Sequence, residues 1–289
     1  MMYQFDPKSS AVEETFRDIA LSQLDEALEA LTSSASEKRS VVHEARRRCK
    51  KLRGLLRLVR PAFPGFEMEN AAIRDAAALL SHLRDAEVLH ETVGKLAESS
   101  GSEAVARVAA HLSAEPLPEP PPDKITEFRL RLLAVRERAT EWTMRKDKPG
   151  VLLSGLRATY KQDRERMGKA LASGDPTDFH DWRKAQKAHG FHVDLLRRAA
   201  PDVLEADLKT LDKLSEALGV HHDLAVLLHA VDADPARFGS DDDVDVLRAA
   251  IDARRKEIED KAASLGRQLL AEKPRALAER FARYWKGAQ

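Results

Sequence analysis

Apolar side chains recur every three or four positions along most of the chain, and short polar or proline-containing segments separate these stretches. This spacing places the apolar residues on one face of an α-helix. No stretch shows the sustained alternation of apolar and polar residues that is typical of a half-buried strand. The pattern predicts an all-α protein with helices at about residues 11–31, 37–60, 66–98, 103–113, 123–146, 150–172, 177–199, 203–233, 241–272 and 274–286.

Prolines, glycines and capping residues mark the ends of these predicted helices. The sequence PAFPG at 61–65 ends the second helix, because proline lacks a backbone N–H and cannot continue it. The proline-rich segment 115–123 predicts an extended connector, and DKPG at 147–150 predicts a further break. Asp175 or Thr177 is expected to cap the helix that follows.

The chain is neutral overall, but its charge is unevenly distributed. Residues 38–60 carry ten Lys or Arg against one acid, and residues 201–260 carry sixteen acids against seven Lys or Arg, although the formal net charge is zero. Hydrophobic residues make up 43% of the chain, enough for a sizeable core, while aromatic residues make up 5%. The sequence therefore predicts a folded but electrically polarised molecule.

The remaining compositional features concern the cellular compartment. Cys49 is the single cysteine, so no intrachain disulfide can form, and its position on the apolar side of its helix predicts a packing role. The N-terminus lacks the apolar region of a signal peptide, and no run approaches the ~20 apolar residues of a membrane span. We expect a cytoplasmic protein that does not contact the membrane.

The most informative feature is a row of basic residues that begins with a histidine and occurs twice. The first row is His43, Arg46, Lys50 and Arg53, and the second is His180, Arg183 and Lys187, which lies 137 residues further on. At about 100° per residue, these offsets fall within an arc of roughly 80° on a helix. Each row therefore forms one cationic ridge, and two ridges suggest a ligand with many negative charges.

A second pair of similar segments follows the two rows. LLSHLRDAEVL at 79–89 aligns with ALGVHHDLAVL at 217–227, which places Arg84 and Asp85 opposite His222 and Asp223. The spacing between the two motifs is kept to within one residue, which indicates an internal duplication. We predict two four-helix bundles related by pseudo-twofold symmetry, with residues 1–148, including the connector 115–123, in the first and residues 149–289 in the second.

At these residues the chain resembles the CHAD domain family, an all-helical family named for its histidines, over about residues 11–286. VHEARRRCKKLRGLLRL and FHDWRKAQKAHGF match its histidine motif, and LGVHHDLAVL matches its second motif. The resemblance implies a basic groove or channel that binds inorganic polyphosphate. The residues that it implies for this role are His43, Arg46, Arg47, Lys50, Lys51, Arg53, Arg57, Arg84, Arg157, Lys161, Arg164, His180, Arg183, Lys184, Lys187 and His222.

The second row departs from the first, because Ala188 and Gly190 stand where the first row has Lys51 and Arg53. We expect the preceding helix to compensate with its own basic residues Arg157, Lys161 and Arg164. Asp85 and Asp223 are interpreted as structural residues near the site, because a carboxylate facing a polyanion would repel it. His43 and His180 either contact the ligand or organise the site.

Several functions remain open at this point. The leading one is non-enzymatic polyphosphate binding that targets the protein to polyphosphate granules, without a cofactor, a metal or catalytic residues; other polyanions are further candidate ligands. A polyphosphate- or triphosphate-metabolising enzyme or its accessory is the second candidate. Against it, di-iron bundles need the Glu-x-x-His pattern on two helices, and it occurs once in this chain. No Walker-type phosphate-binding loop is present either. A nucleic-acid-binding helical protein and a scaffold that contacts an acidic partner are the remaining two candidates.

Overall fold

The computed structural model describes residues 3–9, 11–31, 38–80, 82–117 and 121–289, and their side chains except those of 38–40 and 82–85. Within these residues the protein is all-α and has no strand, as predicted. The helices of the first half are α1 (Val12–Ala30), α2 (Lys38–Val59), α3 (Phe66–Ala78), α4 (His82–Ser100), α5 (Glu103–Ser113) and α6 (Pro122–Ala139). The helices of the second half are α7 (Gly150–Ser173), α8 (Pro176–Leu195), α9 (Pro201–Ala233), α10 (Asp241–Leu269) and α11 (Pro274–Gly287).

Two predicted helices end earlier than their periodicity suggested. The expected helix 66–98 is divided into α3 and α4, and the Leu80 carbonyl oxygen at this division accepts a hydrogen bond of 2.6 Å from Arg46 Nη1. The expected helix 123–146 ends at Ala139. Just after this end, Trp142 packs against both Phe16 and Phe63, with ring centroids 5.5 and 5.1 Å away.

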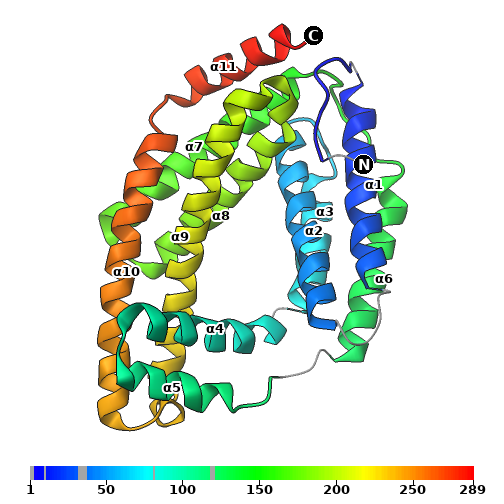
Figure 1. The fold of residues 1–289 in the computed structure, drawn as a ribbon. Coiled ribbons are helices and arrows are strands. Elements are labelled where there is room, and N and C mark those ends of the chain that lie inside the picture. The colour runs from blue at the N-terminus through cyan, green and yellow to red at the C-terminus, as the bar shows by residue number, and fades with distance from the viewer. Residues whose placement is uncertain (1–2, 10, 32–37, 81, 118–120) are drawn as a thin grey trace.

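Helices α1, α2, α3 and α6 lie side by side, and α7, α8, α9 and α10 form a second group that meets α2 at one end (Figure 1). The main core runs through both groups and contains Phe16, Leu55, Leu132, Leu156 and Phe281. One continuous core therefore joins the two halves of the chain.

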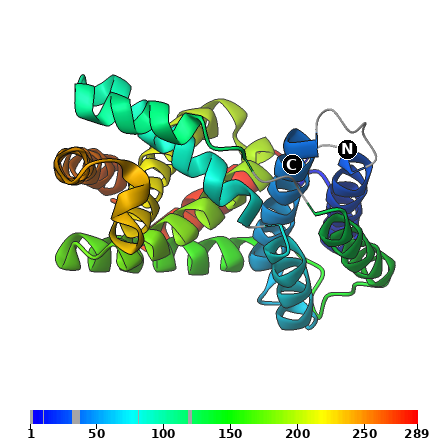
Figure 2. The ribbon, with the colours of Figure 1, turned by 90° about the horizontal axis from the view of Figure 1, so that it is seen from below.

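Helices α4 and α5 pack against α9 and α10 rather than against α1, α2 and α6, as the view from below shows (Figure 2). They form a separate core in which Val93 and Val105 meet Leu227, Phe238 and Ile251. The predicted duplication would place α4 and α5 in the first bundle, whereas the structure connects them to the second half. The division of the chain at residue 148 stays a prediction.

Two glycines allow α2 to approach the second half closely. A Cβ atom at Gly155 of α7 would lie 1.8 Å from the carbonyl oxygen of Leu58. A Cβ atom at Gly54 of α2 would lie 2.8 Å from the side chain of Phe191 on α8. The absence of these side chains brings α2 against both α7 and α8, and this crossing fixes the position of the basic residues of α2 relative to those of α8.

Candidate functional site

The basic row of α2 stands opposite the packed face of the same helix. Ala45, Cys49 and Leu52 are at most 1% exposed, whereas His43 and Arg47 are exposed. Burial raises the pKa of the Cys49 thiol to about 12, so this thiol is a packing group and not a nucleophile. The predicted separation of a packed face and a cationic face is confirmed for this helix.

Basic residues of α2 line two clefts that lie on either side of α8. The first, which we call the α9-side cleft, has a volume of about 580 Å³ between α2, α8 and α9. The second, the α7-side cleft, has a volume of about 930 Å³ between α2, α3, α7 and α8. Helix α8 directs Arg183 and Lys187 to the first cleft and Lys184 to the second, because these positions lie on different faces of the helix.

The α9-side cleft contains most of the predicted basic residues together with several acids. Its lining includes His43, Arg47, Lys50, Lys51, Arg183, Lys187, Arg197 and Lys209, and the acids Asp194, Glu205 and Asp212. Lys51 lies over the ring of Tyr3, 4.6 Å from its centroid, and burial lowers the pKa of this lysine. Burial raises the pKa of Asp194, which lies near Lys51. Glu205 forms ion pairs with Arg197 and Lys209, so part of the positive charge in this cleft is neutralised by the protein itself.

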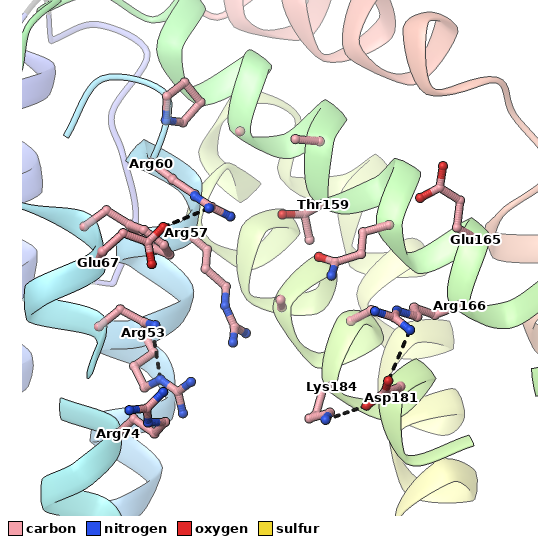
Figure 3. A pocket seen from close by; sticks show the side chains of 18 residues that line it. Arg53, Arg57, Arg60, Glu67, Arg74, Thr159, Glu165, Arg166, Asp181 and Lys184 are labelled. Atoms are coloured by element: carbon pink, nitrogen blue, oxygen red, sulfur yellow. Dashed lines mark hydrogen bonds and ion pairs between the residues drawn. The ribbon is translucent and has the colours of Figure 1, made fainter. Parts of the chain in front are cut away.

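The α7-side cleft places basic residues on both of its walls (Figure 3). Arg53 and Arg57 come from α2, Arg60 directly follows this helix, and Arg74 comes from α3; Arg166 of α7 and Lys184 of α8 lie opposite them. Thr159 of α7 adds a neutral hydroxyl on the second wall. This arrangement offers hydrogen-bond donors from four helices to an anion in the cleft.

Arg53 and Arg57 carry positive charge in a half-buried environment. Burial is the main cause that lowers the pKa of Arg53 to about 10, and the nearby Arg57 and Arg74 lower it further. Burial and Arg60 lower the pKa of Arg57 in the same way. Asn70, a neutral residue, accepts the hydrogen bond of Arg53 Nε at 3.0 Å. A nearby anion would raise both pKa values again, because it favours the charged form of each guanidinium group.

The carboxylates of the α7-side cleft are bound to neighbouring cations. Glu67 pairs with Arg60 at 2.8 Å, and Asp181 pairs with Lys184 at 2.5 Å and with Arg166 at 3.1 Å. Lys184 lowers the pKa of Asp181, mainly through this hydrogen bond. These acids hold the side chains of the second wall and of Arg60 in place.

The predicted histidine of α8 lies next to a histidine of α9. The Nδ1 atoms of His180 and His222 are 3.1 Å apart, and their ring centroids are 4.3 Å apart. Two protonated rings could not share this contact, so at least one ring is neutral. Burial and, to a smaller extent, Arg183 lower the pKa of His222 to about 4, and burial lowers the pKa of His180. The pair continues the line of Arg183 and Lys187 along α8 but lines neither cleft.

Other predicted residues lie elsewhere. Arg157, Lys161 and Arg164 line neither cleft; Lys161 pairs with Glu165 at 3.6 Å, and Arg164 donates to the carbonyl oxygens of Leu270 and Glu272. These residues therefore do not compensate for the missing basic residues of α8 within the clefts. Arg46 lines neither cleft and donates to Leu80, as described above.

The second predicted pair, Arg84 and Asp85, belongs to α4, and its side chains lie outside the described residues. Asp223 is partly buried on α9.

Five basic residues of the clefts were missed in the sequence. Arg60 directly follows α2 and lies three residues after Arg57, so extending the α2 row by one turn would have found it. Arg74, Arg166, Arg197 and Lys209 come from segments that tertiary packing brings to the clefts, and no local pattern identifies them.

Two further observations limit the chemistry of the described part of the chain. It contains no group of three or more His, Cys, Asp or Glu side chains arranged to hold a metal ion. None of its helices is long and apolar enough to cross a membrane.

The chain belongs to the CHAD domain family, because the family model matches residues 18–232, well over half of its length. This membership confirms the resemblance seen in the histidine motifs. Among solved structures, the fold is similar to "PptA from Streptomyces chartreusis", with a TM-score of 0.58 and 15% sequence identity, over 91% of this chain and 100% of that chain. At this identity the similarity concerns the fold alone. No curated protein matches the sequence.

Proposed function

We propose that the protein binds inorganic polyphosphate without catalysing its turnover, using the cations that α2 and α8 present in the two clefts. The observation that carries this proposal is the pair of half-buried guanidinium groups of Arg53 and Arg57, next to the exposed end of the same row at His43 and Arg47. A row of cations along one helix matches a linear ligand with a negative charge on each repeat. Membership of the CHAD family supports the same ligand.

The magnitudes favour clefts over a simple surface patch. An exposed ion pair contributes about 0.2–1 kcal/mol. A charge-assisted hydrogen bond in a partly desolvated site contributes about 1.5–3 kcal/mol. Micromolar binding needs about 8 kcal/mol net. Four contacts of the second kind, made by Arg53, Arg57, Arg183 and Lys187, contribute about 6–12 kcal/mol before the costs of binding, whereas four exposed pairs contribute at most about 4 kcal/mol.

Two carboxylates of the α7-side cleft support binding rather than hydrolysis. Asp181 and Glu67 are paired with Lys184, Arg166 and Arg60, so they act as anchors for cations and are not directed as bases toward a ligand. Hydrolysis of a phosphoanhydride would require a group that activates water beside the bound phosphate.

A broad nucleic-acid footprint is less compatible with the charge distribution. The acids Asp194, Glu205 and Asp212 line the α9-side cleft, and a duplex lying across this surface would meet them. A narrow chain can follow the basic row of α2 and avoid them. We further propose that the protein works in the cytoplasm and joins polyphosphate granules through this contact.

Calorimetric titration with long-chain polyphosphate tests the proposal when duplex DNA is added as a competitor and released orthophosphate is assayed in parallel. We expect salt-sensitive binding that DNA at matched phosphate concentration does not displace, without release of orthophosphate. Displacement by DNA would favour a nucleic-acid-binding protein, and release of orthophosphate would show an enzyme. No binding of either polymer would leave a role in contacting an acidic protein partner.

A further inference from the structure

The described segment before α1 packs against α2 and against the end of α8. The backbone N–H of Phe5 donates a hydrogen bond of 2.8 Å to the carbonyl oxygen of Leu195, and the Phe5 side chain is buried. Asp6 forms an ion pair of 2.7 Å with Arg198, just after α8. These contacts hold the segment in place, and Tyr3 is thereby fixed beside α2.

Tyr3 contacts Lys51 of α2 at two points. Its hydroxyl donates a hydrogen bond of 2.6 Å to the carbonyl oxygen of Lys51. Burial raises the pKa of Tyr3 well above its usual value, so this hydroxyl keeps its proton. The Nζ atom of Lys51 lies over the ring of Tyr3, 4.6 Å from the centroid, and the face of an aromatic ring attracts a cation at this distance. Tyr3 therefore holds both the backbone and the charged end of Lys51.

Lys51 differs from two other cations of the α9-side cleft in the group that accompanies its charge. Arg197 and Lys209 both form ion pairs with Glu205. Among the residues that the structure describes, no carboxylate lies within ion-pair distance of the Lys51 ammonium group, and Asp194 acts on it at longer range. An aromatic ring attracts the ammonium charge but supplies no oxygen to accept its hydrogen bonds. Lys51 can therefore donate to a phosphate without first breaking an ion pair.

We propose that Tyr3 is a positioning residue of the polyphosphate site, which holds the ammonium group of Lys51 in the α9-side cleft for contact with phosphate oxygens. This inference rests on the proposed function. Lys51 lines the cleft and Tyr3 does not, so the ring lies behind the ammonium group and leaves its cleft side open to the ligand. A lysine side chain that is mobile before binding loses its freedom when it grips an anion, and this loss weakens binding. The ring of Tyr3 orders Lys51 in advance and reduces that loss.

Calorimetric titration of Tyr3 variants with long-chain polyphosphate tests the inference. Tyr3→Leu keeps an apolar side chain but removes the ring, and its affinity should fall by about two- to tenfold, the effect of ordering one long side chain on binding. Tyr3→Phe keeps the ring and should retain most of the affinity. Unchanged or tighter binding by Tyr3→Leu, or an equal loss in Tyr3→Phe, would overturn the role of the ring and leave the proposed function standing. Absence of binding by the wild type would overturn both.

A double-mutant cycle with Lys51→Gln separates positioning from a general structural effect. Lys51→Gln alone should weaken binding and reduce the slope of log K against log salt by about 0.7, the effect of one lost phosphate contact. Adding Tyr3→Leu to this variant should change the affinity no further, because the group that Tyr3 positions is already absent. An effect of Tyr3→Leu that is equally large in both backgrounds, or full affinity of Lys51→Gln, would overturn the inference.

Tyr284→Leu is the matched control, because Tyr284 of α11 also has a cation over its ring. The Cζ atom of Arg280 lies 5.7 Å from the centroid of that ring, and neither residue lines a cleft. This variant should bind polyphosphate as the wild type does, and thermal unfolding confirms that each variant is folded at the temperature of the titration. A loss equal to that of Tyr3→Leu would show a general effect of removing a tyrosine and would overturn the inference.

The proton chemical shifts of the Lys51 side chain give an independent readout of its position. A methylene group over the face of an aromatic ring is shifted upfield by the ring current. We expect this shift for the Cε protons of Lys51 in the wild type and in Tyr3→Phe, but not in Tyr3→Leu, and we expect it to persist when polyphosphate binds. Loss of the shift on binding would show that the ammonium group leaves the ring to reach the ligand, which would overturn the inference.

Discussion

The Nε2 atom of His192 on α8 lies 3.0 Å from the carbonyl oxygen of Gly54 on α2 and donates a hydrogen bond to it. The ring is fully buried, and this bond joins α8 to α2 through two residues that are 138 positions apart in the chain. A donating Nε2 atom leaves Nδ1 without a proton in the neutral ring. Burial lowers the pKa of this ring to about 3, so the crossing of α2 and α8, which positions both clefts, contains a histidine that is neutral at pH 7.

The stability of the protein should decrease as the pH falls below about 6.5. Burial is the main cause that lowers the pKa of His192 from 6.5 to about 3, so between these values the unfolded chain binds a proton that the folded protein does not. The free energy of unfolding therefore decreases with falling pH in this window, by about 2 kcal/mol between pH 7 and pH 5 for one such group. The lowered pKa of His222, about 4, acts in the same direction.

Urea unfolding of the wild type and of His192→Gln at these two pH values checks this prediction. Glutamine retains a donor for the Gly54 carbonyl but does not titrate, so the variant should lose less stability at the lower pH. Carboxylates such as Glu44, whose pKa is lowered to about 2 mainly by Arg47, titrate at lower pH and do not affect the comparison. Identical losses in both proteins would contradict the assignment to His192.

Gly155→Ala should destabilise the protein, and Gly168→Ala on the same helix should not. The new methyl group at position 155 would overlap the backbone of Leu58, which forces α2 and α7 apart at a cost of about 1–3 kcal/mol. No atom lies within 4 Å of a Cβ at Gly168, so alanine there should stabilise α7 by about 0.5–1 kcal/mol. Midpoints of thermal unfolding for the two variants give the comparison, and equal shifts would argue against a close contact at Gly155.

Leu52→Ala should lower the free energy of unfolding by about 2–5 kcal/mol, because the side chain is 1% exposed and its removal leaves a cavity in the core. Leu130→Ala is the control: this leucine of α6 is 60% exposed, and its loss should change stability by less than about 0.5 kcal/mol. Denaturant titrations measure both values. Under conditions where each variant is folded, polyphosphate affinity should remain that of the wild type, since neither residue lines a cleft.

Local sequence patterns were sufficient to predict the start of α8 and the buried face of α2, the two helices that carry most of the site. The predicted cap at Asp175 is confirmed, because its side chain accepts a hydrogen bond of 2.6 Å from the Thr177 amide at the start of α8. The buried face of α2 is confirmed as well. In both cases the signal lies within one or two turns of a single helix.

Features that depend on distant residues were not predictable in the same way. The division between α3 and α4 interrupts a continuous helical pattern, since α4 packs on α9 and α10 in its own core. Arg74 and Arg166 reach the α7-side cleft through the packing of α3 and α7 against their neighbours. Periodicity describes which face of a helix is buried but not which helix covers it.

The salt dependence of polyphosphate affinity, compared between the wild type and a combined Lys50→Ala, Arg57→Ala and Lys187→Ala variant, tests the central claim most directly. Each lost phosphate contact should reduce the slope of log K against log salt by about 0.7, or about 2 for the three together, with a clear loss of affinity at low salt. The combined Arg129→Ala, Lys256→Ala and Lys261→Ala variant removes the same charge from positions outside both clefts and should keep the affinity and slope of the wild type. Equal changes in the two variants, or none in either, would contradict binding in the clefts of α2 and α8.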